Sequence, residues 1–187
     1  YARQGSNYKY GPVQQFTTSS VTINMSVNLI TQTNATFTGD YEQPDGSGIE
    51  IGVLYSLSSS ALKADSDAVE KIKLTNKTFR QKVSDLKYNT TYYYCTYVYQ
   101  SGTYKYGSVQ NFKTNNVTVE VSVGDITQTT ATFSGKTEIT ESDAIEVGIL
   151  YSTSSSLSPT SSFTTKKVLG NGSFSFKVED LKNNTRY

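Results

Sequence analysis

The chain has 187 residues, with 17 basic and 16 acidic side chains for a net charge of +1, and with 15 tyrosines but no histidine. A balanced charge predicts no nucleic-acid partner. Because a chain without histidine has neither a Ser-His pair nor a His-ligated metal site, we expect no enzyme activity, no cofactor and no metal. The sequence contains no apolar run of 18 residues or more, so we expect no membrane span.

Short segments with strand character follow one another along the chain. Residues 21–29 alternate apolar and polar side chains, and 35–37 continue that alternation. Residues 49–55 are apolar on both faces apart from a Glu and a Gly, residues 92–98 are rich in tyrosine, and 109–112 close the series. A period of two is typical of half-buried strands, and six or seven short strands in a segment of this size favour a β-sandwich. The predicted fold class is therefore all-β.

An internal repeat organises these segments. The sequence ITQTNATFTG (30–39) recurs as ITQTTATFSG (126–135), and VSDLKYNTTY (83–92) recurs as VEDLKNNTRY (178–187). A fixed-period repeat indicates tandem copies of one structural unit. We therefore predict tandem immunoglobulin-like β-sandwiches.

The opening segment belongs to the same repeat. Its sequence YARQGSNYKYGPVQQFTT (1–18) matches YVYQSGTYKYGSVQNFKT (97–114). We therefore predict that residues 1–18 are the closing strands of a preceding repeat, that 19–114 form a complete sandwich, and that 115–187 form a sandwich lacking its last strands. Two arrangements follow: either the array continues within one longer polypeptide, or the opening strands of one subunit complete the last sandwich of a neighbour.

Two segments resemble a known family. LKYNTTYYYCT (86–96) resembles the E–F corner of fibronectin type III domains, and YGSVQNFKT (106–114) resembles the closing strand of their bacterial variety, which recurs in tandem on secreted and surface proteins. The resemblance implies the fibronectin type III-like sandwich and a hydroxyl of Tyr92 bonded to upstream backbone. Phe37 and Phe133 stand where animal members carry tryptophan.

A set of tyrosines forms the candidate contact surface. If Tyr92 and Tyr94 face the core, alternate residues of the same strand project from the opposite face. With two tyrosines that follow, they make up the tyrosine cluster: Tyr93, Tyr97, Tyr99, Tyr104 and Tyr106. The cluster could bind sugar, contact another protein, or only stabilise the sheet through cross-strand pairs. Cys95 lies on the same face and is expected to be a partly exposed passenger.

Seven N-x-Ser/Thr sequons are candidate glycosylation sites. They begin at Asn24, Asn34, Asn76, Asn89, Asn116, Asn171 and Asn183. Asn24 and Asn34 are expected at outward positions of strands, where a glycan would find room. The alternative is that a chain rich in Ser and Thr contains sequons by chance.

The sequence predicts a non-enzymatic structural or adhesive repeat protein, extracellular or at the cell surface. Such sandwiches, joined head to tail, would form part of a fibre or filament. The expected partner is the protein itself, through neighbouring repeats or subunits; glycans or host surface proteins are further candidates. The alternative is an accessory spacer or carbohydrate-binding module of a larger secreted protein.

Overall fold

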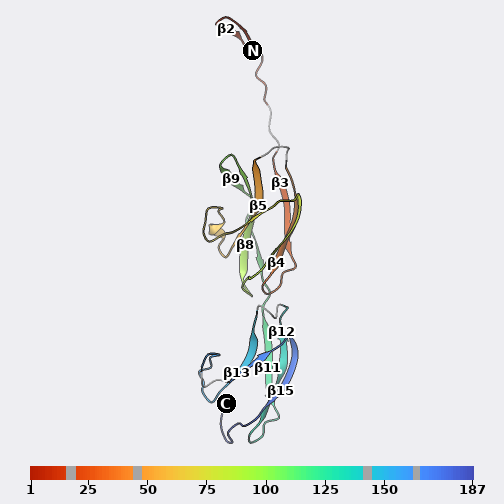
Figure 1. Ribbon diagram of the computed structural model, residues 1–187, viewed down its shortest axis with the longest axis vertical. Coiled ribbons are helices and arrows are strands. Elements are labelled where there is room, and N and C mark those ends of the chain that lie inside the picture. Colours follow the sequence, from red (N-terminus) through yellow and green to blue (C-terminus); the bar gives the residue numbers. More distant parts are fainter. Residues whose placement is uncertain (16–19, 44–47, 141–144, 162–164) are drawn as a thin grey trace.

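The chain folds almost entirely into β-strands, as its composition predicts. The computed structural model describes residues 1–15, 20–43, 48–140, 145–161 and 165–187. Within those ranges a single 3-10 turn, Ser59–Ala61, is the only helical element. No helix in the described part of the chain is long and apolar enough to cross a membrane. Figure 1 shows two sandwiches stacked end to end, with a small hairpin at the N-terminal end of the molecule.

The first sandwich packs a three-stranded sheet against a five-stranded sheet. The three-stranded sheet has the order β3-β4-β7 and consists of β3 (Thr22–Asn28), β4 (Ala35–Glu42) and β7 (Thr78–Val83). The five-stranded sheet has the order β10-β8-β5-β6, with β9 paired to β8, and consists of β5 (Ile49–Ser56), β6 (Glu70–Lys73), β8 (Thr91–Gln100), β9 (Thr103–Tyr106) and β10 (Gln110–Lys113). Strand β5 is therefore paired along both of its edges.

The second sandwich repeats the first sheet and part of the second. Its first sheet has the order β11-β12-β15 and consists of β11 (Thr118–Gly124), β12 (Ala131–Glu138) and β15 (Gly172–Val178). Its other sheet pairs only β13 (Val147–Tyr151) with β14 (Thr165–Leu169). Strand β14 pairs with one edge of β13, as β6 pairs with β5. Along the other edge, where β5 pairs with β8, β13 has no partner strand among the described residues.

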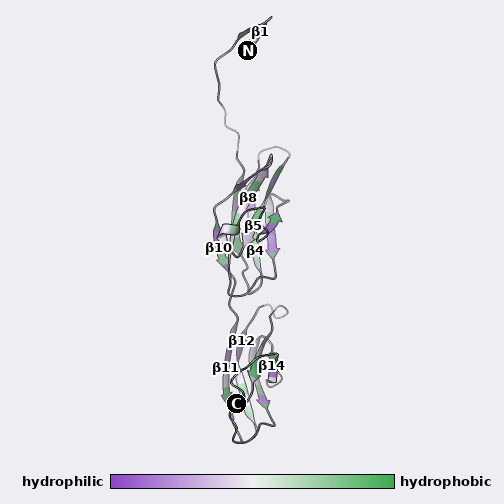
Figure 2. Cartoon of the chain, turned by 90° about the vertical axis from the view of Figure 1, so that its left-hand side faces the viewer, coloured by the Kyte–Doolittle hydropathy of each residue, from purple (hydrophilic) through white to green (hydrophobic). Residues whose placement is uncertain are grey.

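Aromatic rings fill the centre of the first sandwich. The fully buried Phe37 ring lies 5.4 Å from the Tyr94 ring and 6.0 Å from the Phe112 ring, measured between centroids. Tyr92 stacks on Phe112 at 5.6 Å. Figure 2, coloured by hydropathy, shows hydrophilic and hydrophobic stretches side by side on the strands, as expected when one face of each strand is buried. This core depends on β8 and β10, which follow β4 at a long sequence distance.

The tyrosine corner implied by the family resemblance is present. The Lys87 N–H donates to the hydroxyl of Tyr92 over 2.9 Å. The second sandwich repeats this bond, since the Lys182 N–H donates to the hydroxyl of Tyr187 over 3.0 Å. Because the turn needs a left-handed residue, Asn89 adopts a φ of 50° there, a conformation that asparagine tolerates.

The opening segment forms a hairpin of its own. Strand β1 (Ala2–Gln4) pairs antiparallel with β2 (Asn7–Lys9), and Figure 1 shows this hairpin well away from the first sandwich. The boundary expected between the opening segment and the first complete repeat, at residues 18 and 19, lies outside the described residues.

Candidate functional site

The five-stranded sheet of the first sandwich carries a second cluster of side chains on its outer face. Leu54, Leu62, Cys95 and Tyr97 are buried there, away from the core between the sheets. The connection from β5 to β6 supplies Leu62 and so covers part of this face. The tyrosine cluster therefore lies on the predicted face of β8, but much of it is beneath other residues.

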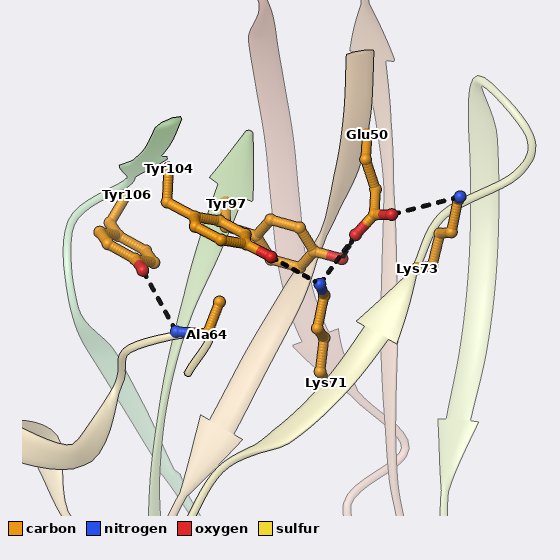
Figure 3. A network of polar contacts seen from close by, with 7 residues as sticks. All are labelled: Glu50, Ala64, Lys71, Lys73, Tyr97, Tyr104 and Tyr106. Atoms are coloured by element: carbon orange, nitrogen blue, oxygen red, sulfur yellow. Dashed lines mark hydrogen bonds and ion pairs between the residues drawn. The ribbon is translucent and has the colours of Figure 1, made fainter. Parts of the chain in front are cut away.

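Glu50 of β5 is the centre of a polar network on this face (Figure 3). Its carboxylate accepts a hydrogen bond from the Tyr97 hydroxyl over 2.8 Å. It also pairs with the ammonium groups of Lys71, at 2.9 Å, and Lys73, at 3.2 Å. Lys71 in turn donates to the Tyr104 hydroxyl over 3.0 Å and lies 4.9 Å from the centroid of the Tyr97 ring. The network ties four neighbouring strands of one sheet together.

This arrangement holds Glu50 in its charged form. The hydrogen bond from Lys71, followed by that from Tyr97, lowers the pKa of the Glu50 carboxyl to about 2. The same bond to Glu50 raises the pKa of Lys71, and burial raises the pKa of the Tyr97 hydroxyl. A carboxylate with so low a pKa carries no proton at neutral pH, so Glu50 is suited to holding the sheet rather than to general acid catalysis.

A glycine makes room for the most buried tyrosine. A Cβ atom on Gly52 would lie 2.4 Å from a carbon of the Tyr97 ring and 2.2 Å from the carbonyl oxygen of Ile72. Both separations are far below van der Waals contact, so the ring can lie across β5 only because residue 52 has no side chain. The repeat preserves this glycine in the second sandwich as Gly148, in the matching segment IEVGILYS.

The exposure of the tyrosine cluster differs from what alternation along one strand suggests. Tyr97 is fully buried, Tyr93, Tyr99 and Tyr104 are half-buried, and Tyr106 is exposed. Tyr99 packs against Tyr104 at 4.5 Å, and the Tyr106 hydroxyl accepts a hydrogen bond from the Ala64 N–H over 3.1 Å. The Tyr99–Tyr104 contact is a cross-strand pair of the kind that the structural interpretation expects, whereas Tyr106 bonds the connection between β5 and β6. A role in binding stays a prediction.

Cys95 corrects a sequence-based expectation. Its side chain is 1 % exposed, packed between the outer face of β8 and the covering connection, so it is not the partly exposed residue that the sequence suggested. Burial raises the pKa of its thiol, which keeps the group protonated and unreactive. The error arose because alternation assigns a face of the strand but not what covers that face.

The sequons differ in accessibility. All except Asn34 are exposed, and Asn24 lies on the outer face of β3 as expected. Asn34 is buried before β4 rather than on an outward strand position, and its amide donates to the hydroxyls of Thr31 and Thr33. The outward placement of Asn34 was therefore wrong: its motif ITQTNATF forms a tight turn whose side chains bond the backbone. Glycosylation at the other six stays a prediction.

The polar junction between the sandwiches is a structural feature that the sequence analysis missed. Gln32 is 4 % exposed; its amide donates to the carbonyl oxygen of Asn116 over 3.3 Å, and its oxygen accepts from the N–H and the hydroxyl of Thr140. Asn115 donates to the carbonyls of Ile30 and Thr31. The recurrence of ITQT in both copies was the available signal, since a glutamine kept at a turn suggests a shared polar contact.

The described residues contain no group of three or more Cys, Asp or Glu side chains placed to hold a metal ion. No protein-family model matches the chain, and no curated protein matches it. Among solved structures, the sensor domain of the anti-sigma factor RsgI4 from Pseudobacteroides cellulosolvens is 28% identical, with a TM-score of 0.42, over 54% of this chain and 99% of that one.

A second solved structure spans both sandwiches. A segment of chicken tenascin with two fibronectin type III domains is 14% identical, with a TM-score of 0.38, over 87% of this chain and 84% of that one. The strand order and the tyrosine corner make the fold an all-β, fibronectin type III-like sandwich.

Proposed function

We propose that this protein is a non-enzymatic structural or adhesive repeat protein that works outside the cell or at its surface, as one stretch of a fibre of β-sandwiches. The observation that carries the proposal is the polar junction at Gln32. A buried glutamine bonded to two segments of the next sandwich fixes the orientation of consecutive repeats. An array whose junctions are fixed stays extended, as a fibre or a spacer must.

The contacts of Glu50 in the candidate site support a mechanical role. Glu50 is neutralised by two lysines and a tyrosine, so the network has no carboxylate free for proton transfer. Its effect is to hold β5, β6, β8 and β9 together from the outer face. A sheet held in this way resists separation of its strands, as an extended surface protein requires.

Two experiments test this proposal. Small-angle X-ray scattering on the wild type and on Gln32→Ala should show a broader distribution of inter-sandwich orientations and a less defined maximum dimension in the variant. Gln128→Ala, at the matching position of the second sandwich, is the control and should leave the profile unchanged. Protease treatment of intact cells should remove the protein from the surface. Protection of the protein until the cells are broken would contradict the proposed location.

The alternative is a carbohydrate-binding or spacer module of a larger secreted protein. Its support was the outward row of tyrosines, and the burial of Tyr97 with the partial burial of Tyr99 weighs against an open sugar platform. Tyr106 keeps an exposed ring. Binding on a glycan array that is lost in Tyr106→Ala would favour this alternative over a structural role.

A further inference from the structure

Strand β3 is an edge of the first sandwich. It pairs with β4 along one side, and no strand of the described residues pairs with its other side. A free strand edge presents a row of unpaired N–H and C=O groups, and most proteins protect such an edge with charged side chains, a proline or a bulge. The other edges of this sandwich follow that rule, since β6 carries Glu70 and two lysines, β7 carries Arg80 and Lys82, and β10 carries Lys113.

Strand β3 has none of these protections. Its residues, Thr22–Asn28, include no charged side chain and no proline. Its register with β4 runs one to one along the whole strand, so it has no bulge. The matching strand of the second sandwich differs at one position, because β11 has Glu120 where β3 has Asn24. The edge of β3 is therefore open to a further strand.

The apolar side chains of β3 are only half covered. Ile23, Met25 and Val27 pack against the core of the first sandwich, yet all three are half-buried. On the opposite edge of the same sheet, Phe79 and Val83 of β7 are buried. The row on β3 thus keeps apolar surface that a strand added beside it would remove from water.

The backbone groups of the same three apolar residues point away from β4. The Tyr41 N–H donates to the Lys77 carbonyl, on the β7 side of β4. Because successive residues of a strand point their backbone groups to opposite edges, those of Asp40 point to β3, where Asn24 lies opposite. Asn24 therefore bonds β4, and the apolar residues on either side of it offer their N–H and C=O groups to the free edge.

The polar side chains on the outer face of β3 leave that edge clear. The Asn24 amide donates to the Asp40 carboxylate over 3.0 Å. Ser26 and Asn28 both bond the Thr38 hydroxyl, at 3.2 Å and 2.7 Å. All of these partners belong to β4, so the side chains are turned towards it and away from the unpaired backbone.

We propose that β3 is a self-association surface, on which β3 of a second copy of this chain pairs antiparallel and joins the two three-stranded sheets into one. The sequence of β3, TINMSVN, has the same order of polar and apolar residues in both directions. Antiparallel pairing that sets Met25 opposite Met25 of the second copy matches all of these residues and keeps the apolar side chains on one face. Each pair of apolar residues then exchanges both of its main-chain hydrogen bonds.

The absence of charge favours a second copy as the occupant. Two identical edges that carry charges repel where like charges come opposite each other, whereas this pairing sets Asn24 opposite Ser26 and Thr22 opposite Asn28. The same patch is used on both chains, so the contact is two-fold symmetric and closes as a dimer. It lies on the side of the first sandwich, away from the junction at Gln32. The inference therefore goes beyond the proposed function and does not depend on it.

Sedimentation equilibrium over a range of concentrations tests the association. Because one strand edge is a small interface, we expect a dissociation constant between about 1 µM and 1 mM. The mass should rise from 20.6 kDa to twice that value and no further. A mass that stays at 20.6 kDa up to about 1 mM would overturn the proposal, and growth beyond two copies would contradict a closed pair.

Added charge gives a matched comparison between the two edges of the sheet. Asn24→Lys combined with Ser26→Lys sets lysine opposite lysine in this pairing and should weaken dimerisation by about tenfold or more. Thr78→Lys combined with Gln81→Lys adds the same charge to β7, the opposite edge, and should change dimerisation much less. Equal weakening by the two variants would show that net charge governs association, and would overturn the assignment to β3.

Disulfide cross-linking tests the register without the lysine variants. In a Cys95→Ala background, a chain with Asn24→Cys mixed with a chain with Ser26→Cys should link, because the Cα atoms of these opposed residues lie about 4.5 Å apart. Either chain alone sets its cysteines on the diagonal, about 7–8 Å apart, and should link far less. No link in the mixture, or equal linking by either chain alone, would overturn the proposed pairing.

Discussion

The two sandwiches share the same local motifs but bury them to different extents. Tyr92 and Tyr187 make the same corner hydrogen bond, yet Tyr92 is 7 % exposed and Tyr187 is 45 % exposed. Phe37 is fully buried, whereas Phe133 lines an open groove of about 1140 Å³ in the second sandwich. The difference comes from β8 and β10, which cover the first core from a distant part of the sequence. Local motifs fix turns and pairs, and partner strands decide how much each residue contributes to stability.

Truncation of a core phenylalanine should give the largest difference in lost stability between the two sandwiches. Phe37→Ala leaves a cavity among three aromatic rings and should lower the free energy of unfolding of the first sandwich by roughly 3–5 kcal/mol. Phe133→Ala removes a ring that already faces a groove and should cost the second sandwich about 1–2 kcal/mol. Urea titration followed by residue-resolved NMR reports both. Equal costs would mean that the groove is closed in solution.

The contacts of Glu50 and Glu146 should give the next largest difference in stability between the two sandwiches. Glu50→Gln should lower the free energy of unfolding by roughly 1–2 kcal/mol at neutral pH, because three charge-assisted bonds to Glu50 weaken. Glu146→Gln removes an exposed pair and should change it by less than about 0.5 kcal/mol.

The contribution of Glu50 to stability should depend on pH. Folding lowers the pKa of Glu50 from 4.5 to about 2, so its contribution is fully present above pH 4.5 and is lost as the pH falls from there towards 2. The unfolding free energy of the wild type should fall across this window, and Glu50→Gln should flatten that part of the profile. The same slope in both proteins would contradict the assignment.

The corner hydroxyls should give the smallest difference. Tyr92→Phe removes the acceptor for a part-buried backbone N–H and should cost about 1 kcal/mol. Tyr187→Phe leaves an N–H that water can reach and should cost less than about 0.5 kcal/mol. Thermal unfolding with residue-resolved detection is suitable for both. A larger cost for Tyr187→Phe would show that the second sandwich is more closed than the first.

Sequence patterns predicted the parts of this molecule that depend on neighbours along the chain. Alternation identified the faces of β3 and β8, and the resemblance to fibronectin type III domains implied the tyrosine corner. Patterns failed for Cys95 and Tyr97 because their burial depends on a distant segment, the connection that carries Leu62. They failed for Asn34 because its side chain bonds within its own turn. Gln32 was missed because its partners, Asn116 and Thr140, belong to the next sandwich.

The direct test of this account is amide hydrogen exchange along β13. In a chain held at low concentration, the β13 amides that do not pair with β14 should exchange fast, unlike those of β5, which is paired on both edges. Exchange along β13 as slow as along β5 would contradict the claim that strands from a distant part of the sequence protect the first sandwich.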